Sequence, residues 1–215
     1  MRSTDFSPTT PTSIEAPAGA LDEVCPGGLS TRQALASATR EVHERLHRHP
    51  GLAAVQSGSI DRPGYARLLG RLYGFHEPFE REGRLVPTRS IWLESDLTAF
   101  GTGPAQQAAL PRCRGFPDLS SDEAMLGALY VVEGSALGGA TLARRLEGLV
   151  GHGVLDGRRF FSGHGSRTGD AWRAYLLRLS NASPASEVRA TIVATALATF
   201  ALFEQWIAGW ENRND

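Results

Sequence analysis

Near the middle of the chain, residues 127–147 have the sequence Gly127-Ala-Leu-Tyr-Val-Val-Glu-Gly-Ser-Ala-Leu-Gly-Gly-Ala-Thr-Leu-Ala-Arg-Arg-Leu-Glu147. Apolar residues recur at helical spacing before and after the centre of this stretch, which predicts helix on both sides. The centre, residues 134–139, holds three glycines, and each glycine inside a helix costs about 1 kcal/mol relative to alanine. Gly134 and Gly138 are four positions apart, so they share one helical face that carries no side chains.

Such a bare face has two interpretations. It allows a kink or the close packing of two helices through small residues, and it also allows a flat ligand to lie almost against the main chain. The surrounding sequence favours the ligand, because Tyr130-Val-Val-Glu-Gly-Ser-Ala-Leu-Gly-Gly139 resembles the distal-helix motif of the bacterial heme oxygenases. That resemblance requires an axial histidine elsewhere in the chain.

His43 is the candidate histidine and lies on an earlier predicted helix. Ser30-Thr-Arg-Gln33 has the form of a capping box, and apolar residues at helical spacing continue to about His49. A histidine at the edge of an apolar face is most often a hydrogen-bonded structural residue. The phrase Ala38-Thr-Arg-Glu-Val-His43, however, resembles the proximal-helix motif of heme oxygenases, in which the histidine is the iron ligand.

A non-heme metal site is a third interpretation of the same helix. Glu44-Arg-Leu-His47 is one Glu-x-x-His unit, and di-iron bundles need two. The other histidine on a predicted helix, His76, has Tyr73 at the corresponding position, so a second unit is missing. We therefore interpret His76 as structural.

The rest of the chain predicts an all-α fold of about seven helices, without an alternating strand pattern. Pro78 is expected to kink or split the second helix, and residues 160–165 are expected to form an aromatic loop. Residues 1–29 are rich in Ser, Thr, Pro and Gly, so a disordered tail is predicted before one domain over residues 30–215. The predicted helices cover residues 30–49, 61–80, 90–100, 105–110, 120–150, 168–180 and 183–210.

The resemblance implies a single-domain heme oxygenase-like helical bundle, with heme between the proximal helix and a kinked, Gly-rich distal helix. It also covers Leu93-Glu-Ser-Asp-Leu97, which fits a Leu-x-x-Asp-Leu phrase of the family. Arg173 stands near basic positions of the family, and an arginine fork suits a heme propionate. The residues assigned to the site by resemblance are His43 as axial ligand of the heme iron, and Tyr130, Gly134, Ser135, Gly138, Gly139 and Arg173 around the heme.

Ser135 departs from the pattern of many heme oxygenases. In those proteins an Asp follows the first distal glycine and orders the water chain that delivers protons. A serine hydroxyl can still hold a water molecule, but it lacks the charge of a carboxylate. Glu133 neighbours Gly134, yet it is expected to point about 100° away around the helix. Ser135 is thus the predicted distal residue of the water network.

The activity implied by the resemblance is the O2- and reductant-dependent cleavage of heme to biliverdin, CO and ferrous iron. Heme would serve as both substrate and cofactor. Electrons would come from an external donor, either a protein or a small reductant, because the sequence has no flavin or nicotinamide motif. Biliverdin is also a chromophore of phytochrome-type photoreceptors, so chromophore supply to a phytochrome and iron release are both open as biological roles.

Two rival classes of function stay open at this stage. A non-catalytic heme-binding or storage protein on the same fold would share His43 and the glycines. An all-α enzyme with another ligand, such as a di-iron oxidase or a thiamine-degrading enzyme, would need a second Glu-x-x-His unit or a placed catalytic cysteine. The sequence shows neither a second Glu-x-x-His unit nor a placed catalytic cysteine, which argues against both enzymes.

Composition narrows the partners. The chain has 215 residues and a net charge of −1, so no electrostatic surface for nucleic acid or anionic lipid is expected. All 22 of its Lys+Arg residues are arginine. No apolar run approaches the ~18 residues of a membrane span. Cys25 and Cys113 cannot build a disulfide framework, and the N-terminus lacks a signal-peptide core. The expected location is the cytoplasm.

Overall fold

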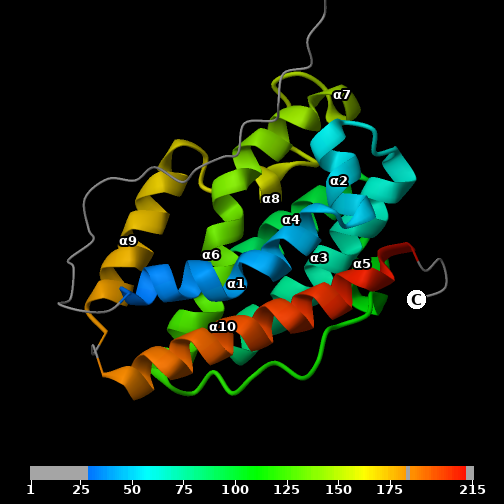
Figure 1. Ribbon diagram of the computed structural model, residues 1–215. Helices are drawn as coiled ribbons and strands as arrows, with labels where there is room; N and C mark the ends of the chain where they lie inside the picture. The colour runs from blue at the N-terminus through cyan, green and yellow to red at the C-terminus, as the bar shows by residue number, and fades with distance from the viewer. Residues whose placement is uncertain (1–28, 183–184, 212–215) are drawn as a thin grey trace, which may run out of the picture. The chain divides into compact units, whose positions relative to one another are not determined.

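The computed structural model describes residues 29–182 and 185–211, and this part of the chain contains helices and no β-strand (Figure 1). The predicted all-α fold is confirmed. The predicted tail lies outside the described residues apart from Leu29, and so does Cys25. The helices are α1 (Thr31–His47), α2 (Pro50–Ser57), α3 (Arg62–Glu82), α4 (Arg89–Ala99), α5 (Pro104–Ala109), α6 (Asp122–Arg145), α7 (Glu147–Val150), α8 (Arg159–Ser162), α9 (Thr168–Ser180) and α10 (Ser186–Ile207), with the 3-10 turns η1 (Gly165–Arg167) and η2 (Ala208–Glu211).

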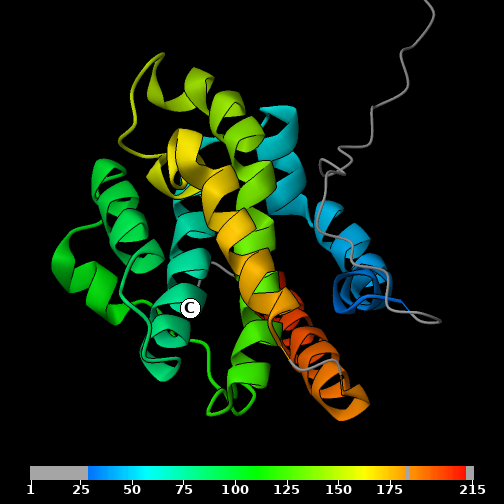
Figure 2. The same cartoon turned by 90° about the vertical axis from the view of Figure 1, so that its left-hand side faces the viewer.

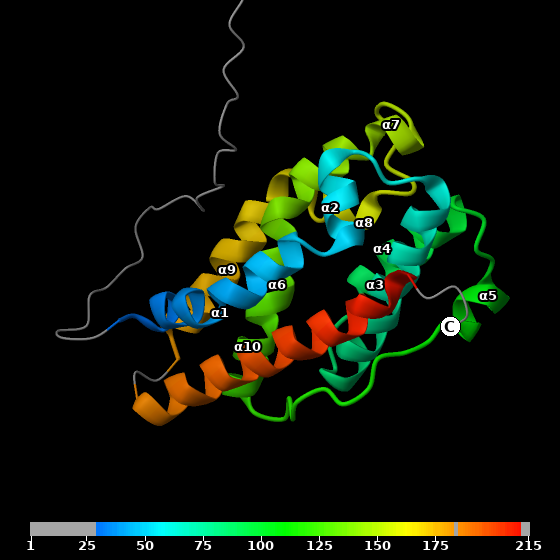
Figure 3. The same ribbon diagram turned by 45° about the vertical axis from the view of Figure 1, so that its right-hand side comes forward.

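The central helix is α6. Figure 2 shows α3, α4 and α5 on one side of it and α1 on the other. α10 packs against α6 more extensively than any other pair of helices pack, and α1 lies along α10 (Figures 1 and 3). Gly127 permits the α6–α10 contact, because a β-carbon at this position would stand 2.3 Å from the backbone oxygen of Ile192. The main chains of α6 and α10 are therefore in close contact at Gly127.

α6 continues as one helix through the glycine stretch. Its N-cap is Ser121, whose hydroxyl oxygen accepts a hydrogen bond from the amide of Ala124 (3.1 Å). The sequence pattern predicts the cap one residue earlier, at Ser120. The helix ends at Arg145 and α7 follows as a separate turn, so the single helix predicted to reach residue 150 is two helices.

α3 runs unbroken through Pro78, so the predicted split is wrong. Proline has no N–H, which leaves the carbonyl oxygen four residues earlier, on Gly74, without its helical donor. The amide of Cys113 donates to that oxygen instead (2.8 Å). Gly74 allows this approach, because a β-carbon there would lie 2.4 Å from the backbone oxygen of Pro111. The proline thus anchors the segment after α5 to α3.

Two further short helices are missing from the prediction. Pro50 ends α1 as expected, but a proline also suits a first helical turn, and it begins α2, with His49 as N-cap. Phe160 and Phe161, predicted in a loop, lie in α8. The predicted start of the last helix at Ser183 and Pro184 lies outside the described residues, and α10 is described from Ser186.

Among the described residues, two helices are long and apolar enough to span a membrane by length and composition alone, α6 and the stretch Ser186–Trp210. The sequence expectation that no run approaches such a length is therefore too strict. Both helices pack on each other and on further helices. The core helix of a globular protein has the same composition, so this finding gives no argument for a membrane location.

Two buried carboxylates hold α4 between its neighbours. Glu80 of α3 accepts hydrogen bonds from the amides of Arg89 (2.7 Å) and Ser90 (3.1 Å) at the start of α4. Asp96 of α4 is fully buried and accepts from the amides of Arg159 (2.7 Å) and Phe160 (2.8 Å) at the start of α8. Each carboxylate satisfies amides that a helix N-terminus leaves without partners.

Asp96 should make stability depend on pH. Burial raises the pKa of this carboxyl to about 6, although hydrogen bonds from backbone amides oppose the shift. A raised pKa favours the protonated folded state, so this contribution is complete below the unfolded pKa, near 4, and is lost as the pH rises through 6. Two pKa units correspond to roughly 3 kcal/mol.

The measurement compares wild type with Asp96→Asn by urea unfolding at pH 4.5 and at pH 7.5. The variant should be less stable at both, because an amide offers only one acceptor oxygen to the two backbone donors. The stability difference between the two proteins should be larger at the lower pH. An equal difference at both pH values would show that Asp96 does not titrate in this range.

Candidate functional site

α1 presents two histidines beside its buried face. Thr39 and Val42 are buried, whereas His43 and His47, one helical turn apart, are exposed. Their ring centres lie 4.6 Å apart in an edge-to-face arrangement. Partial desolvation, followed by the nearby His47, lowers the pKa of His43. His43 is therefore neutral at neutral pH, which is the form that ligates iron.

The glycines of α6 fall into two classes. A β-carbon on Gly138 would meet nothing within 4 Å, and one on Gly134 would meet only the edge of Trp172, at 3.9 Å. A β-carbon on Gly139, in contrast, would stand 2.4 Å from the backbone oxygen of Phe161 in α8. Gly134 and Gly138 form an open, bare face, whereas Gly139 is required for helix packing.

This division gives Gly139, one of the predicted site residues, a packing role, and its predicted contact with heme stays a prediction. Gly139 is buried and faces α8, so its small size is explained by contact with another helix. The packing interpretation of the glycine stretch is thus confirmed at Gly139, whereas the ligand interpretation stays a prediction for Gly134 and Gly138. Sequence spacing alone does not separate them, because the packing partner lies 22 positions further along the chain, at Phe161.

Two contacts connect α1 to α6. At one end, the side chain of Tyr130 on α6 interacts with that of Thr39 on α1. At the other, α2, which follows α1 directly, packs on the C-terminal part of α6, where Gly58 faces the carbonyl of Arg145. His43 lies one turn beyond Thr39, and Gly134 lies one turn beyond Tyr130. The candidate ligand and the bare face therefore occupy the parts of both helices between these contacts.

An aromatic group borders the open face. Tyr130 lies close to Trp172 and Tyr175 of α9, with ring centres 6.1 and 6.5 Å away, and the latter two rings are stacked. The hydroxyl of Tyr175 donates to the carbonyl of Leu126 (3.0 Å), which fixes α9 to α6. Burial raises the pKa of Tyr130, so it stays uncharged. The group gives one edge of the face an apolar, aromatic border.

The polar side chains on and near α6 differ in whether they are free to bind a further group or are already held in an ion pair. Ser135 is exposed, and its hydroxyl donates back to the carbonyl of Val132 (2.8 Å), which leaves its oxygen able to accept. Glu133 points to α4 and pairs with Arg89 (3.0 Å), as expected from its position on the helix. Arg173 is exposed and pairs with Asp170 one turn earlier on α9. Its predicted contact with a propionate stays a prediction.

The Glu133–Arg89 ion pair is a feature that the sequence did not indicate. Both side chains are mostly buried, at 19% and 10% exposure, behind the glycine stretch. His76 is buried nearby, and desolvation, followed by the charge of Arg89, lowers its pKa to about 3. His76 is therefore a neutral core residue. No local spacing could have revealed the pair, since its members are far apart in the chain.

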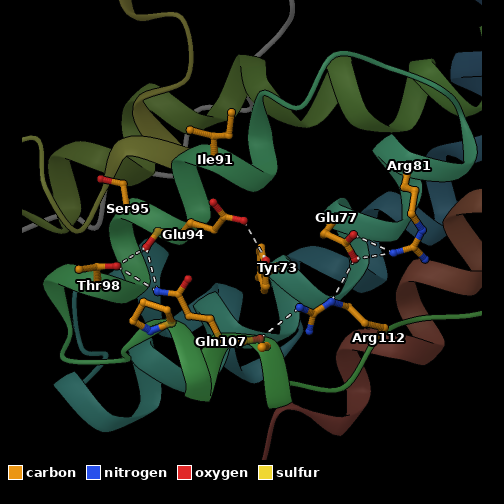
Figure 4. A pocket seen from close by; sticks show the side chains of 11 residues that line it. Tyr73, Glu77, Arg81, Ile91, Glu94, Ser95, Thr98, Gln107 and Arg112 are labelled. Carbon is orange, nitrogen blue, oxygen red and sulfur yellow. Dashed lines mark hydrogen bonds and ion pairs between the residues drawn. The ribbon is translucent and has the colours of Figure 1, made fainter.

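A hollow of about 720 Å³ lies away from these residues, between α3, α4 and α5 (Figure 4). Its polar side chains are paired with one another: Tyr73 donates to Glu94 (2.9 Å), and Glu77 accepts from Arg81 and Arg112. None of the predicted site residues lines it. Because the hollow lies apart from the predicted site residues and Glu77 already pairs with Arg81 and Arg112, we assign it no role in the chemistry.

The di-iron and catalytic-thiol alternatives are not supported by the described residues. Within them, no three or more His, Cys, Asp or Glu side chains are grouped to hold a metal ion. Cys113 is buried, and this burial raises its thiol pKa to about 11. A thiol with such a pKa is not a nucleophile at neutral pH.

Comparisons with known proteins agree with this geometry. The heme oxygenase family model matches residues 29–209. A heme oxygenase from Xanthomonas campestris pv. campestris (strain 8004) is 31% identical over 169 residues, which cover 73% of this chain and 96% of that protein.

Solved structures show the same fold. The heme oxygenase from Leptospira interrogans superposes with a TM-score of 0.67 at 20% identity, covering 84% of this chain and 99% of that one. Heme oxygenase-1 from the cyanobacterium Synechocystis sp. PCC6803, solved in complex with heme, gives 0.61 at 17% identity over 85% of this chain and 93% of that one. With the family model matching nearly the whole described chain, the protein belongs to the heme oxygenase family, a family of oxidoreductases.

Proposed function

We propose that the protein binds heme between α1 and α6 and cleaves it, with O2 and an external reductant, to biliverdin, CO and ferrous iron. The observation that carries the proposal is the open face at Gly134 and Gly138, on a helix that is joined to α1 one turn before His43. A flat macrocycle can lie against such a face, since no β-carbon stands in its way. Bound heme would supply both the iron that activates O2 and the carbon skeleton that is cut.

The residues of the chain would act on either side of the ring. The neutral imidazole of His43 would bind the iron on the α1 side. On the α6 side, Gly134 and Gly138 would leave room for a diatomic molecule but little more. Ser135 would accept a hydrogen bond from a water molecule near this face, because its own hydrogen is donated to Val132.

Several parts of the proposal concern partners and location. Electrons would come from a separate protein or small reductant, and a phytochrome would be one acceptor of the biliverdin. A cytoplasmic location would suit a chain with buried, unpaired Cys113. The rival function is storage of intact heme, which the serine at position 135 favours, because it supplies no carboxylate to order a proton-delivering water chain.

One spectral experiment separates these functions. Hemin is added to the purified protein and the Soret band is recorded, after which ascorbate is added in air. We expect a Soret band of bound heme that then disappears while the broad red absorption of biliverdin grows. A Soret band that persists under reductant and air would refute turnover and support storage. Absence of any Soret shift would refute heme binding itself.

A further inference from the structure

His43 and His47 form a pair of neighbouring imidazole rings on α1, and this pair suits a role independent of heme. They lie four residues apart on α1, both side chains are exposed, and their ring centres are 4.6 Å apart. Residues at this spacing are neighbours on one helical face. Among the described residues, the two rings contact each other, and the carboxylate of Glu44 interacts electrostatically with His43.

The ring separation matches that of two imidazoles on one metal ion. With metal–nitrogen distances of about 2.0–2.1 Å, two imidazole ring centres lie about 4.5 Å apart when the ligand–metal–ligand angle is near 90°, and about 5.2 Å apart in a tetrahedral site. The observed 4.6 Å is close to the first value. Square-planar and octahedral geometries contain such angles, and Cu²⁺ and Ni²⁺ prefer them.

We propose that His43 and His47 chelate a divalent first-row transition-metal ion in the heme-free protein, and that metal and heme compete for His43. Water would complete the coordination, since no third His, Cys, Asp or Glu among the described residues joins the pair. The chelate stands on the geometry of α1 alone. Its competition with heme rests on the proposed function.

The test is a calorimetric titration of tag-free, metal-free protein with NiCl2 at neutral pH. We expect one Ni²⁺ per chain, and about 100-fold weaker binding in either His43→Gln or His47→Gln, because each variant reduces the chelate to a single ligand. Both side chains are exposed, so the fold should survive, which circular dichroism verifies.

The matched control is His152→Gln. His152 is 93% exposed and lies beside Glu147 (2.6 Å), so it represents an exposed histidine with an acidic neighbour. Its replacement should leave Ni²⁺ affinity unchanged. Wild-type affinity in His47→Gln, or an equal loss in His152→Gln, would overturn the chelate.

A second measurement tests the competition. Saturating Ni²⁺ should shift the hemin titration of the wild-type protein to higher hemin concentration, and His47→Gln should abolish this shift. An unshifted titration would overturn the competition. If the protein bound Ni²⁺ as expected but gave no Soret band at all, the proposed function would fail while the metal site stood.

Discussion

Replacing His43 with alanine is expected to lower heme turnover by at least ~100-fold, or about 3 kcal/mol of barrier. The neutral His43 imidazole is the proposed axial ligand, and among the described residues only His47 offers a second imidazole on the same face of α1. Turnover is followed as the rate of biliverdin formation with ascorbate in air. The Soret maximum of the hemin complex should shift as well, because the axial ligand is lost.

The matched control is His47→Ala, which removes the neighbouring exposed histidine and keeps the proposed ligand. It should retain the wild-type Soret maximum and turnover within a small factor. Supplying imidazole to His43→Ala should restore part of the original spectrum, which a purely structural role of His43 would not produce. Unchanged spectrum and turnover in His43→Ala would refute axial ligation by this residue.

Alanine at the two adjacent glycines of α6 is expected to act in opposite directions on stability. Gly139→Ala should destabilise the fold by about 2–3 kcal/mol, since the new methyl would meet the backbone oxygen of Phe161 at 2.4 Å and backbone cannot move aside cheaply. Gly138→Ala should stabilise the fold by up to about 1 kcal/mol, since alanine is the better helix former and meets nothing within 4 Å.

Heme affinity should be lowered by the variant that stabilises the fold, Gly138→Ala, and not by the variant that destabilises it, Gly139→Ala. The methyl of Gly138→Ala would occupy the bare face, and we expect hemin to bind about tenfold more weakly, which corresponds to about 1.4 kcal/mol. Gly139→Ala should keep its hemin affinity at temperatures where it is folded. Thermal unfolding gives the stability of each variant, and hemin titration gives the hemin affinity of each. Equal destabilisation by the two changes would contradict the open face at Gly138.

The parts of the fold that sequence predicts well are those decided by near neighbours. α3, α4 and α9 follow from apolar residues at helical spacing, and Asp61 caps α3 as a helix-start residue should. The spacing is less reliable for single positions: Ala38, three residues after Leu35 and four before Val42, stands where helical spacing predicts a buried residue, yet it is exposed and Thr39 is buried instead.

Features decided by distant neighbours could not be predicted. α8 forms where the carboxylate of Asp96 meets its first amides, and this partner lies more than 60 positions earlier in the chain. The uninterrupted course of α3 through Pro78 depends on an amide supplied from beyond α5, by Cys113. Two candidate site residues, His43 and Gly134, were predicted through local motifs that resemble a family. The different role of Gly139 required the position of Phe161.

The contacts that hold α8 in place determine which substitutions in its surroundings the fold can tolerate. One side of this short helix is fixed by the carboxylate of Asp96, and the other rests against the bare backbone of Gly139. Main-chain atoms and the carboxylate of Asp96 thus position α8 between α4 and α6, in addition to the Glu133–Arg89 ion pair that joins these two helices directly. Large side chains elsewhere on α4 and α6 can therefore change while the position of α8 stays constant.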